Sequence, residues 1–399
     1  MKYDFDKIIP RRSTASVKWD FTSDDDMIPL WVADMDFKAA PPIIKALKAR
    51  AEHGVFGYAL PPAGYYEASC RWFKNRHGLQ VQPGWILPTT GVVSALSAII
   101  KALCRPEDKV IIQTPVYNCF FSAVENNSCQ TLENPLIYEN GSYRIDFEDL
   151  QKKAEDPRAK VMILCNPHNP AGRVWSKEEL EHIGKICLKN NIAVVADEIH
   201  CELIRPGFVY TPFASLNKDF LLNSITCTSP SKAFNLAGLQ TANIFCADKE
   251  IRTKIEKALH INETALIGPF GIDALIAAYN ECADWLEELN SYLNENYLTL
   301  KSFFEKEMPD FPVTPLEGTY LVWINCRKLK KSSKDISDIL LQNGVRINPG
   351  RIYGEAGEGF IRINIACPRA LLKEGLNRIK KLWAKLFERY IKEALLTSK

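Results

Sequence analysis

The 399-residue sequence lacks the features that mark several large classes of protein. Its formal net charge is only +2, from 50 basic and 48 acidic residues, so it has no positive excess of the kind that binds nucleic acid. No apolar run approaches the ~20 residues that span a bilayer, and residues 1–7 lack the apolar segment of a secretion signal. We therefore expect a cytoplasmic protein that binds neither nucleic acid nor membranes.

Several common site motifs are also missing. There is no G-x-x-x-x-G-K-[ST] loop, so Val194–His200, which looks like the acidic strand of a nucleotide triphosphatase, has no phosphate loop to accompany it. The G-x-G-x-x-G fingerprint of a dinucleotide fold is absent, and the six histidines show no metal-ligand spacing, so we predict no metal. Twelve scattered cysteines without a C-x-x-C pair favour buried free thiols in a reducing compartment over a disulfide scaffold.

What the sequence does contain is an alternation of apolar strands and amphipathic helices over residues 117–245. Residues 192–196 predict a buried strand, and residues 176–188 predict a helix that Ser176 caps ahead of Glu179. This alternation predicts an α/β fold with a mostly parallel sheet and helices on both faces, and the chain length predicts two domains. We also predict helices after Pro41-Pro42, over residues 270–305 and from Pro368, and strands over residues 239–246, 319–325 and 360–366.

An asparagine-rich turn, an aspartate and a lysine follow one another along the chain in a suggestive order. Lys232 lies in Thr228–Leu239 between small hydroxyl residues and an apolar turn, where lost hydration favours a neutral, nucleophilic amine suited to a Schiff base. Taken alone, such a lysine is far more often an ordinary surface residue. However, Asp197 ends a buried strand, at the edge of the sheet where ligands bind, and Val161–Gly172 runs from a strand into two Asn-Pro pairs. Together the three segments predict one site.

Other segments have two interpretations that the pattern leaves open. Thr89–Leu96 is a strand-glycine-helix junction whose free N–H groups favour a phosphate, although most such junctions bind nothing. Tyr117 ends a predicted strand and is either a packed core residue or part of the site. Arg362 lies mid-strand among isoleucines, either as a clamp for a substrate carboxylate or as an outward residue on the polar face. Residues 28–37 form either an edge strand or the rim of a site.

These segments together resemble the fold type I pyridoxal-phosphate enzymes of the aminotransferase class I/II family. Pro29–Phe37, Asp197–His200 and Ser229–Leu239 are similar to the MalY/PatB branch, the cystathionine β-lyase-like C–S lyases. The similarity covers essentially the whole chain. It implies a large domain, residues 46–284, with a mostly parallel seven-stranded sheet flanked by helices. It also implies a smaller α/β domain built from residues 1–45 and 285–399.

The resemblance also implies roles for individual residues around pyridoxal 5'-phosphate. Lys232 would hold the cofactor aldehyde and move the Cα proton, Asp197 would pair with the pyridine nitrogen, and Tyr117 would stack on the ring. Substrate contacts would come from Arg362, Ala33 and Asn364. The remaining cofactor contacts that it implies are Gly91, Val92, Val93, Asn169, His200, Ser229, Ser231 and, from a neighbouring subunit, Tyr58.

The resemblance implies a homodimer with shared active sites that acts on a small amino-acid substrate. The segment 31–37, His200 in place of a tyrosine and Gln240 in place of a phosphate-binding arginine match the C–S lyase branch. No second arginine stands out for a side-chain carboxylate. We therefore expect β-elimination from cystathionine or a related cysteine thioether. Two alternatives stay open, an aminotransferase and a cofactor-bearing protein whose main task is to bind a regulatory partner.

Overall fold

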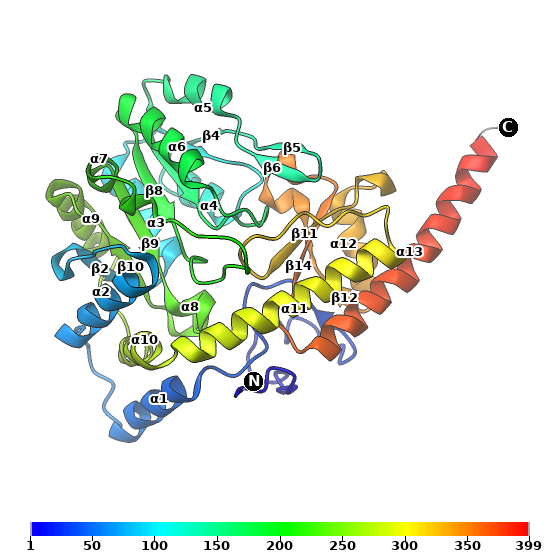
Figure 1. Ribbon diagram of the computed structural model, residues 1–399, viewed down its shortest axis with the longest axis horizontal. Coiled ribbons are helices and arrows are strands. Elements are labelled where there is room, and N and C mark those ends of the chain that lie inside the picture. The colour runs from blue at the N-terminus through cyan, green and yellow to red at the C-terminus, as the bar shows by residue number, and fades with distance from the viewer. Residues whose placement is uncertain (1, 398–399) are drawn as a thin grey trace.

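The computed structural model describes residues 2–397, with side chains described as far as residue 383. A seven-stranded sheet with the order β2-β10-β9-β8-β7-β3-β4 forms the centre of the larger part of the molecule (Figure 1). Every pairing in it is parallel except the two that β10 makes with β2 and β9, which confirms the predicted sheet. Its strands are β2 (Ile86–Thr89), β3 (Lys109–Ile112), β4 (Gln130–Glu133), β7 (Ala159–Cys165), β8 (Ala193–Asp197), β9 (Ser224–Thr228) and β10 (Ala242–Phe245).

Alternate residues of the central strands enter two different apolar cores. On β7, Val161 and Ile163 pack with helices α3 (Val92–Leu103), α4 (Cys119–Glu125) and α9 (Lys249–Ile261), whereas Met162 and Leu164 pack on the opposite face. That second face is covered by α5 (Phe147–Ala154) and α6 (Lys177–Lys189), and α6 begins with the predicted capping box of Ser176 and Glu179. Because both faces of the sheet are buried, the sequences of its central strands are continuous apolar runs.

A smaller three-stranded sheet lies beside the first and carries Arg362. Its order is β11 (Leu321–Asn325), β14 (Phe360–Asn364) and β13 (Asn348–Pro349), with antiparallel pairing throughout. The strand predicted over 319–325 corresponds to β11, and the strand predicted over 360–366 corresponds to β14. Helix α13 (Arg369–Thr397) begins directly after the predicted Pro368.

The single long helix predicted over residues 270–305 is wrong, because the structure has two helices there. They are α10 (Pro269–Glu281) and α11 (Ala283–Glu307), and they separate at the buried Cys282, whose backbone leaves the helical region (φ −119°, ψ 21°). The break lets α10 pack on α1 (Pro41–His53) and α2 (Ala63–His77) while α11 takes a different direction and packs along α13 (Figure 1). One straight helix could not contact both partners.

The segment Trp31–Asp36, here named the strap, has no regular secondary structure. The edge strand considered for residues 28–37 shrinks to β1 (Ile28–Pro29), which pairs in parallel with β12 (Val345–Arg346). The backbone carbonyls of the strap from Trp31 to Met35 are therefore bonded by side chains and not by a neighbouring strand. The remaining α-helices and strands are α7 (Lys218–Leu222), α8 (Pro230–Ala233), α12 (Ser333–Gln342), and the β5 (Ile137–Glu139) and β6 (Ser142–Arg144) hairpin.

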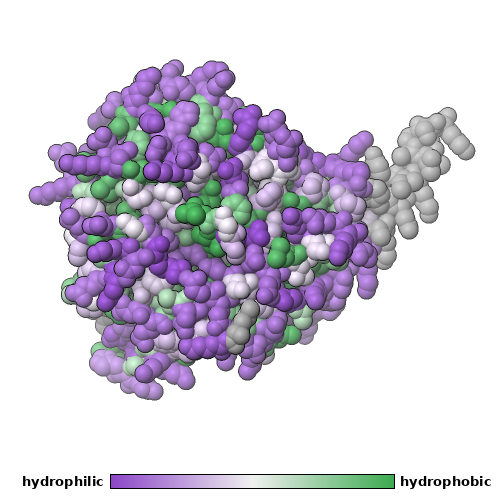
Figure 2. Space-filling model, in the orientation of Figure 1, coloured by the Kyte–Doolittle hydropathy of each residue, from purple (hydrophilic) through white to green (hydrophobic). Residues whose placement is uncertain are grey.

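Within residues 2–397, no helix combines the length and the apolar character that crossing a membrane requires. The face of the molecule in Figure 2 is mostly hydrophilic, and its apolar residues form small separate groups. Such scattered apolar residues are normal on a protein surface.

Gly350 allows a close backbone crossing that supports the smaller sheet. It follows β13, and a Cβ atom there would lie 2.6 Å from the carbonyl oxygen of Phe360 and against that of Gly357. The same turn supports the segment that carries Tyr117, because the Val116 N–H donates to the Tyr353 carbonyl at 2.9 Å.

We expect Gly350→Ala to lower the free energy of unfolding by about 1–3 kcal/mol, because backbone atoms must move apart to admit the methyl group. Urea denaturation of the purified protein measures the change. Gly84→Ala is the matched control, since a Cβ atom at Gly84 meets nothing within 4 Å. Equal stability of the two variants would contradict the close crossing.

Candidate active site

Polar side chains gather at the carboxyl ends of the parallel strands. Asp197 ends β8, Cys165 ends β7 directly beside it in register, and Ser229 follows β9. They line a cavity that, together with its mouth, encloses about 710 Å³ of empty space. Eleven of the residues predicted from the sequence line this cavity: Ala33, Gly91, Val92, Val93, Tyr117, Asn169, Asp197, His200, Ser229, Ser231 and Lys232. The three separate segments therefore do form one site.

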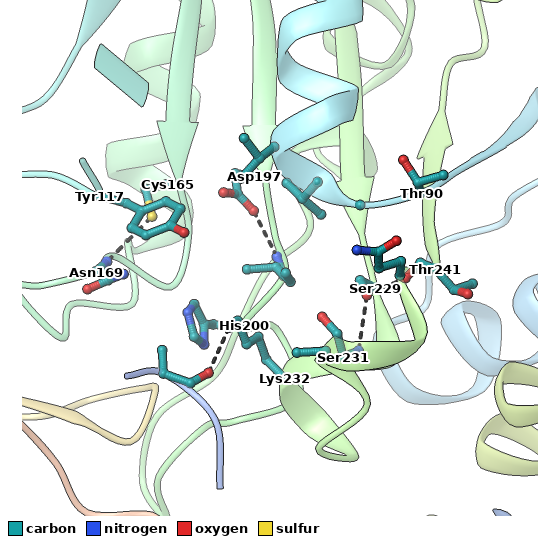
Figure 3. Close-up of a pocket in the computed structure, with 17 residues that line it drawn as sticks. Thr90, Tyr117, Cys165, Asn169, Asp197, His200, Ser229, Ser231, Lys232 and Thr241 are labelled. Carbon is teal, nitrogen blue, oxygen red and sulfur yellow. Dashed lines mark hydrogen bonds between the residues drawn. The ribbon is translucent and has the colours of Figure 1, made fainter. Parts of the chain in front are cut away.

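The amine of Lys232 lies inside this cavity. Lys232 belongs to the short helix α8, which Ser229 caps by accepting the Ser231 N–H at 3.0 Å. Its Nζ donates to the carbonyl oxygen of Ala33 in the strap at 2.7 Å (Figure 3). Desolvation and the nearby Arg362 guanidinium lower the pKa of Lys232 to about 8. A substantial fraction of the amine is therefore neutral near physiological pH.

The carboxylate of Asp197 is buried without a positive partner. Its Oδ1 accepts the Ile199 N–H at 3.2 Å, and no nitrogen of a lysine, arginine or histidine among the described side chains forms an ion pair with it. Burial raises the pKa of Asp197 to about 7. The site thus holds a desolvated acid that a cationic or N–H-bearing ligand would stabilise.

His200 stands beside Asp197 as a neutral imidazole. Burial and the charges of Lys232 and Arg362 lower the pKa of His200 to about 3. Its Nδ1 is buried and has no hydrogen-bond partner within the described part of the chain. Since buried polar atoms are nearly always paired, this nitrogen is available to a ligand in the cavity.

One side of the cavity is suited to an anion. Helix α3 begins there after Gly91, and the first N–H groups of a helix, here at Val92 and Val93, have no partner within the helix and lie at the positive end of its dipole. Ser231 faces the same space, whereas the hydroxyl of Ser229 donates to the Thr241 carbonyl at 2.6 Å. In Figure 3, Thr90, Ser231 and Thr241 lie on one side of Asp197, and Tyr117 and Asn169 lie on the other.

Arg362 faces inward, so it is not an outward residue on a polar face. It is 3% exposed, and its Nη1 and Nη2 donate to Asn169 Oδ1 at 3.1 Å and to the Trp31 carbonyl at 2.8 Å. Its Nε has no hydrogen-bond partner, and no carboxylate among the described residues forms an ion pair with it. A buried guanidinium without an anion is costly, so the geometry favours an anionic ligand next to it.

Three predicted residues do not line the cavity wall in this chain: Arg362, which contacts the lining residue Asn169, and the two residues Asn364 and Tyr58. The Asn364 amide is fully used by the protein, since its Nδ2 donates to the carbonyls of Val32 and Asp34 and its Oδ1 accepts the Ala366 N–H. Tyr58 lies on an outer loop and is 100% exposed. Asn364 therefore supports the strap, and Tyr58 reaches no site within its own chain.

The cavity also includes residues that sequence reasoning did not select. Cys165 could have been found, because it ends a predicted strand next to the one that ends at Asp197. Thr90 could also have been found, because it directly precedes the glycine of the strand-glycine-helix junction that predicted a phosphate site. The full set is Thr90, Cys165, Ile199, Ala237, Gln240 and Thr241, of which Gln240 was noted only for the arginine it replaces.

The family model for aminotransferase class I and II matches residues 25–379, so the chain belongs to that family. Among curated relatives, it is 43% identical to cystathionine beta-lyase PatB of Bacillus subtilis over 94% of this chain and 99% of that protein. Cystalysin from Treponema denticola, a structure that contains pyridoxal 5'-phosphate, is similar with a TM-score of 0.94 and 37% identity, over 97% of this chain and all of the other. The pyridoxal-phosphate-bound C–S lyase of Staphylococcus hominis has a TM-score of 0.88 and 36% identity, over 95% and 98% of the two chains. These likenesses bear out the family and fold that the sequence suggested.

We expect Asp197→Asn to stabilise the ligand-free protein at pH 8. The folded-state pKa of about 7 lies above the ordinary 3.8, so ionisation of Asp197 opposes folding. This penalty is absent below about pH 4, grows up to about pH 7 and is complete above it. Removing the carboxylate should therefore raise stability at pH 8 by up to about 4 kcal/mol, with a smaller gain at pH 5.

Thermal melts of the cofactor-stripped protein at both pH values measure this effect. Asp25→Asn is the control, because the Asp25 side chain is 92% exposed. An Asp197→Asn gain that did not depend on pH would contradict the assignment of a raised pKa.

Proposed function

We propose that the protein is a pyridoxal-phosphate-dependent carbon–sulfur β-lyase. It converts L-cystathionine or a related L-cysteine thioether and water into a thiol, pyruvate and ammonia. The observation that carries the proposal is the single cavity in which Lys232 and Asp197 meet, with the buried Arg362 at its edge. The names of the relatives, a cystathionine beta-lyase, a cystalysin and a C–S lyase, support the same reaction.

The residues in the cavity fit pyridoxal phosphate. Asp197 lacks a positive partner that a pyridine N–H would supply, and the unpaired Nδ1 of His200 is placed to bond a ring substituent. The start of α3 and the Ser231 hydroxyl would hold the phosphate, and Tyr117 would cover the ring. When bound, the cofactor supplies an aldehyde for the lysine and an electron-withdrawing ring that stabilises negative charge on the substrate Cα.

The side chains divide the remaining work. Arg362 binds the substrate α-carboxylate through its unpartnered Nε together with an Nη hydrogen that the protein does not use, the geometry of a bidentate pair. The Lys232 amine, with a pKa of about 8, takes the proton from the substrate Cα as a general base. Asp197 keeps a proton on the ring nitrogen, because the buried carboxylate is most stable beside a positive partner. The apolar side chains of Val92 and Ile199 in the cavity wall limit the water that the cavity can hold.

The absence of a second arginine favours elimination over transamination of an acidic amino acid. Apart from Arg362 at its edge, no arginine is found among the described residues at the cavity, and Gln240 lies in its wall. A substrate with a second carboxylate would need its own cationic partner, whereas a thioether needs none at the sulfur. Lys232 and Asp197 serve both reactions, so only the products separate them.

We propose further that two copies of the chain complete each site. The loop around Tyr58 exposes large apolar side chains that a single chain leaves in water: Val55 at 67%, Phe56 at 57%, Tyr58 at 100% and Leu60 at 79%. Such a contiguous patch is typical of an interface. An isologous two-fold dimer would bring the Tyr58 hydroxyl to the phosphate of the partner's site.

The finer organisation stays a proposal as well. The large domain would comprise residues 46–284, and residues 1–45 and 285–399 would form the small one. The twelve cysteines are all free thiols, which supports a reducing compartment such as the cytoplasm.

With cystathionine and no added 2-oxo acid, the purified protein should release pyruvate continuously, at many turnovers per site. Elimination regenerates the starting enzyme, whereas transamination converts the cofactor and stops without an acceptor. A coupled pyruvate assay together with a free-thiol assay measures both products. Lys232→Ala is the inactive control. Release that ended at one equivalent, or that required a 2-oxo acid, would replace the lyase with an aminotransferase.

Mixing Tyr58→Phe and Lys232→Ala proteins should restore activity if sites are shared. In a mixed dimer, one site then has the intact lysine of one chain and the intact tyrosine of the other. Random exchange should recover about a quarter of wild-type activity, since half of the dimers are mixed and each has one complete site. The sum of the separate variants is the baseline. No gain above that baseline would place Tyr58 outside the partner's site.

A further inference from the structure

The strap is held by side chains instead of by a β-ladder. Each of its five consecutive carbonyl oxygens from Trp31 to Met35 accepts a hydrogen bond from at least one distant side chain. The donors are Arg362 and Asn348 for Trp31, Asn364 for Val32, Lys232 and Tyr320 for Ala33, Lys18 and Asn364 for Asp34, and Arg11 and Asn235 for Met35. The path of the strap therefore depends on what lies beneath it.

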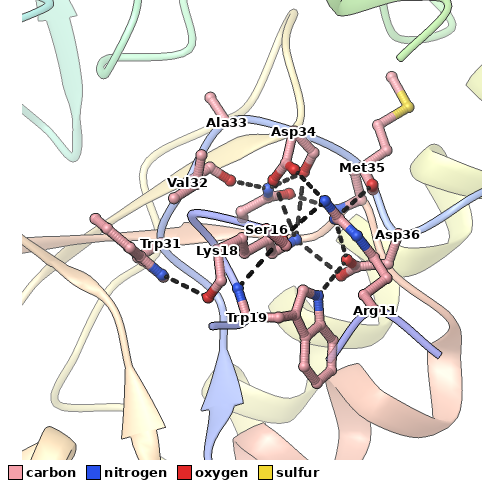
Figure 4. Close-up of polar contacts among 12 residues, drawn as sticks. Arg11, Ser16, Lys18, Trp19, Trp31, Val32, Ala33, Asp34, Met35 and Asp36 are labelled. Carbon is pink, nitrogen blue, oxygen red and sulfur yellow. Dashed lines mark hydrogen bonds and ion pairs between the residues drawn. The ribbon is translucent and has the colours of Figure 1, made fainter. Parts of the chain in front are cut away.

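Four charges lie beneath and within the strap, and we name Arg11, Lys18, Asp34 and Asp36 the strap charge cluster (Figure 4). The Lys18 side chain is 0% exposed, and its Nζ lies 2.8 Å from Asp36 Oδ2. Arg11 bridges both acids, with Nη1 at 2.7 Å from Asp36 Oδ1 and Nη2 at 2.7 Å from Asp34 Oδ2. Two positive and two negative charges balance, so the removal of any one leaves a net charge in a desolvated place.

Asp34 connects this cluster to the active site. Its Oδ2 is bound by Arg11, but its Oδ1 is buried with no hydrogen-bond partner and lies 3.9 Å from Lys18 Nζ. The preceding residue, Ala33, provides the carbonyl that accepts Lys232 Nζ at 2.7 Å. The charge of Asp34 is therefore one residue away from the atom that holds the lysine.

We propose that Asp34 is a positioning residue for Lys232, and that Arg11 and Lys18 hold it in place so that the Ala33 carbonyl and the Asp34 charge together orient the lysine amine. The proposal rests on the proposed role of Lys232 as the amine that carries the cofactor. None of Arg11, Lys18 and Asp34 lines the cavity, so their influence on the reaction passes through the strap.

Several groups from different elements face the Lys232 amine, and their charges have opposite effects. Arg362 on β14 lowers the pKa of Lys232, whereas Asp34 on the strap, Asp197 on β8 and Cys119 at the start of α4 raise it. His200 is neutral and Tyr320 donates to the same carbonyl as the lysine. Among these groups only Asp34 belongs to the strap charge cluster, which lies outside the cavity. Substitutions in that cluster can therefore change the pKa of Lys232 without changing the residues that would contact the cofactor.

The strap charge cluster allows an electrostatic role of Asp34 to be distinguished from a purely structural one. Removing Asp34 removes a negative charge near the amine, so the pKa of Lys232 should fall further. Removing Lys18 or Arg11 removes a positive charge from the same cluster, so the pKa of Lys232 should rise. A strap that was only loosened would change Lys232 in the same direction in all these variants, because each would let water reach the amine.

The test is competitive labelling of Lys232 in the full-length, cofactor-stripped protein. Wild type, Asp34→Asn and Lys18→Met are each treated with trace acetic anhydride between pH 6 and 10, and the acetylation of Lys232 is quantified by mass spectrometry. We expect the apparent pKa of Lys232 to move down in Asp34→Asn and up in Lys18→Met, each on the order of half a unit or more. Asp25→Asn, an exposed acid in the same part of the chain, should leave it unchanged.

Two further variants test the same effect if Lys18→Met does not fold. Arg11→Gln removes the less buried cation, whose side chain is 22% exposed, and should also raise the pKa of Lys232. The double variant Lys18→Met with Asp36→Asn restores charge balance and should return the value toward wild type. Shifts in the same direction for acid and base variants, or a fall in melting temperature with no shift, would overturn the proposal.

The proposed function has a separate check in the same preparation. Borohydride reduction of the wild-type protein loaded with pyridoxal phosphate should fix the cofactor on Lys232. A failure there would refute the cofactor role of Lys232 while leaving the labelling result intact. Same-direction labelling shifts with normal borohydride fixation would refute only the role of Asp34.

Discussion

The structure depends on placing charges where water does not reach them. Among the described side chains, none forms an ion pair with the buried Asp197 in the cavity or with the buried Arg362 at its edge. Charges left in this way oppose folding unless a ligand compensates them. The sheet, the strap and the smaller sheet together supply enough apolar packing to hold this arrangement open for a ligand. The resulting site is complementary to a zwitterion and to a ring that carries an N–H, which is what an amino acid and pyridoxal phosphate present.

The sequence predicted the larger sheet and the centre of the site well, because both follow from local signals. Continuous apolar strands mark a sheet buried on both faces, and a polar residue at the end of such a strand, as at Asp197, must lie at its carboxyl edge. Lys232 was selected for its small hydroxyl and apolar neighbours in the sequence, whereas Asn169 was selected through the family resemblance. These residues could be placed together without knowing any long-range contact.

The remaining features could not be read locally. The direction of the Arg362 side chain was ambiguous because both faces of β14 are buried. The alternation of polar and apolar residues along this strand therefore does not indicate a face that meets solvent. The break at Cys282 has no glycine or proline to mark it, and it arises from the different partners of α10 and α11. The burial of Lys18 with Asp36 has no local pattern in the sequence, and only tertiary contact reveals it. Sequence patterns encode periodicity and chain position, whereas these features depend on which distant elements meet.

The way the strap is anchored has a consequence for local opening. An irregular segment beside a cavity is usually among the first parts of a protein to come away, because it has few backbone hydrogen bonds to lose. Here the five carbonyls are bound by donors from the amino-terminal loop, from α8 and from β13 and β14 of the smaller sheet. Releasing the strap would therefore expose the charge cluster and detach the smaller sheet from α8 in one event. The strap amides that are themselves bonded, Met35 N–H to Asn235 Oδ1 and Asp36 N–H to the Ala366 carbonyl, should therefore exchange about as slowly as those of the core strands. A segment without regular structure thus belongs to the most cooperative unit of the fold.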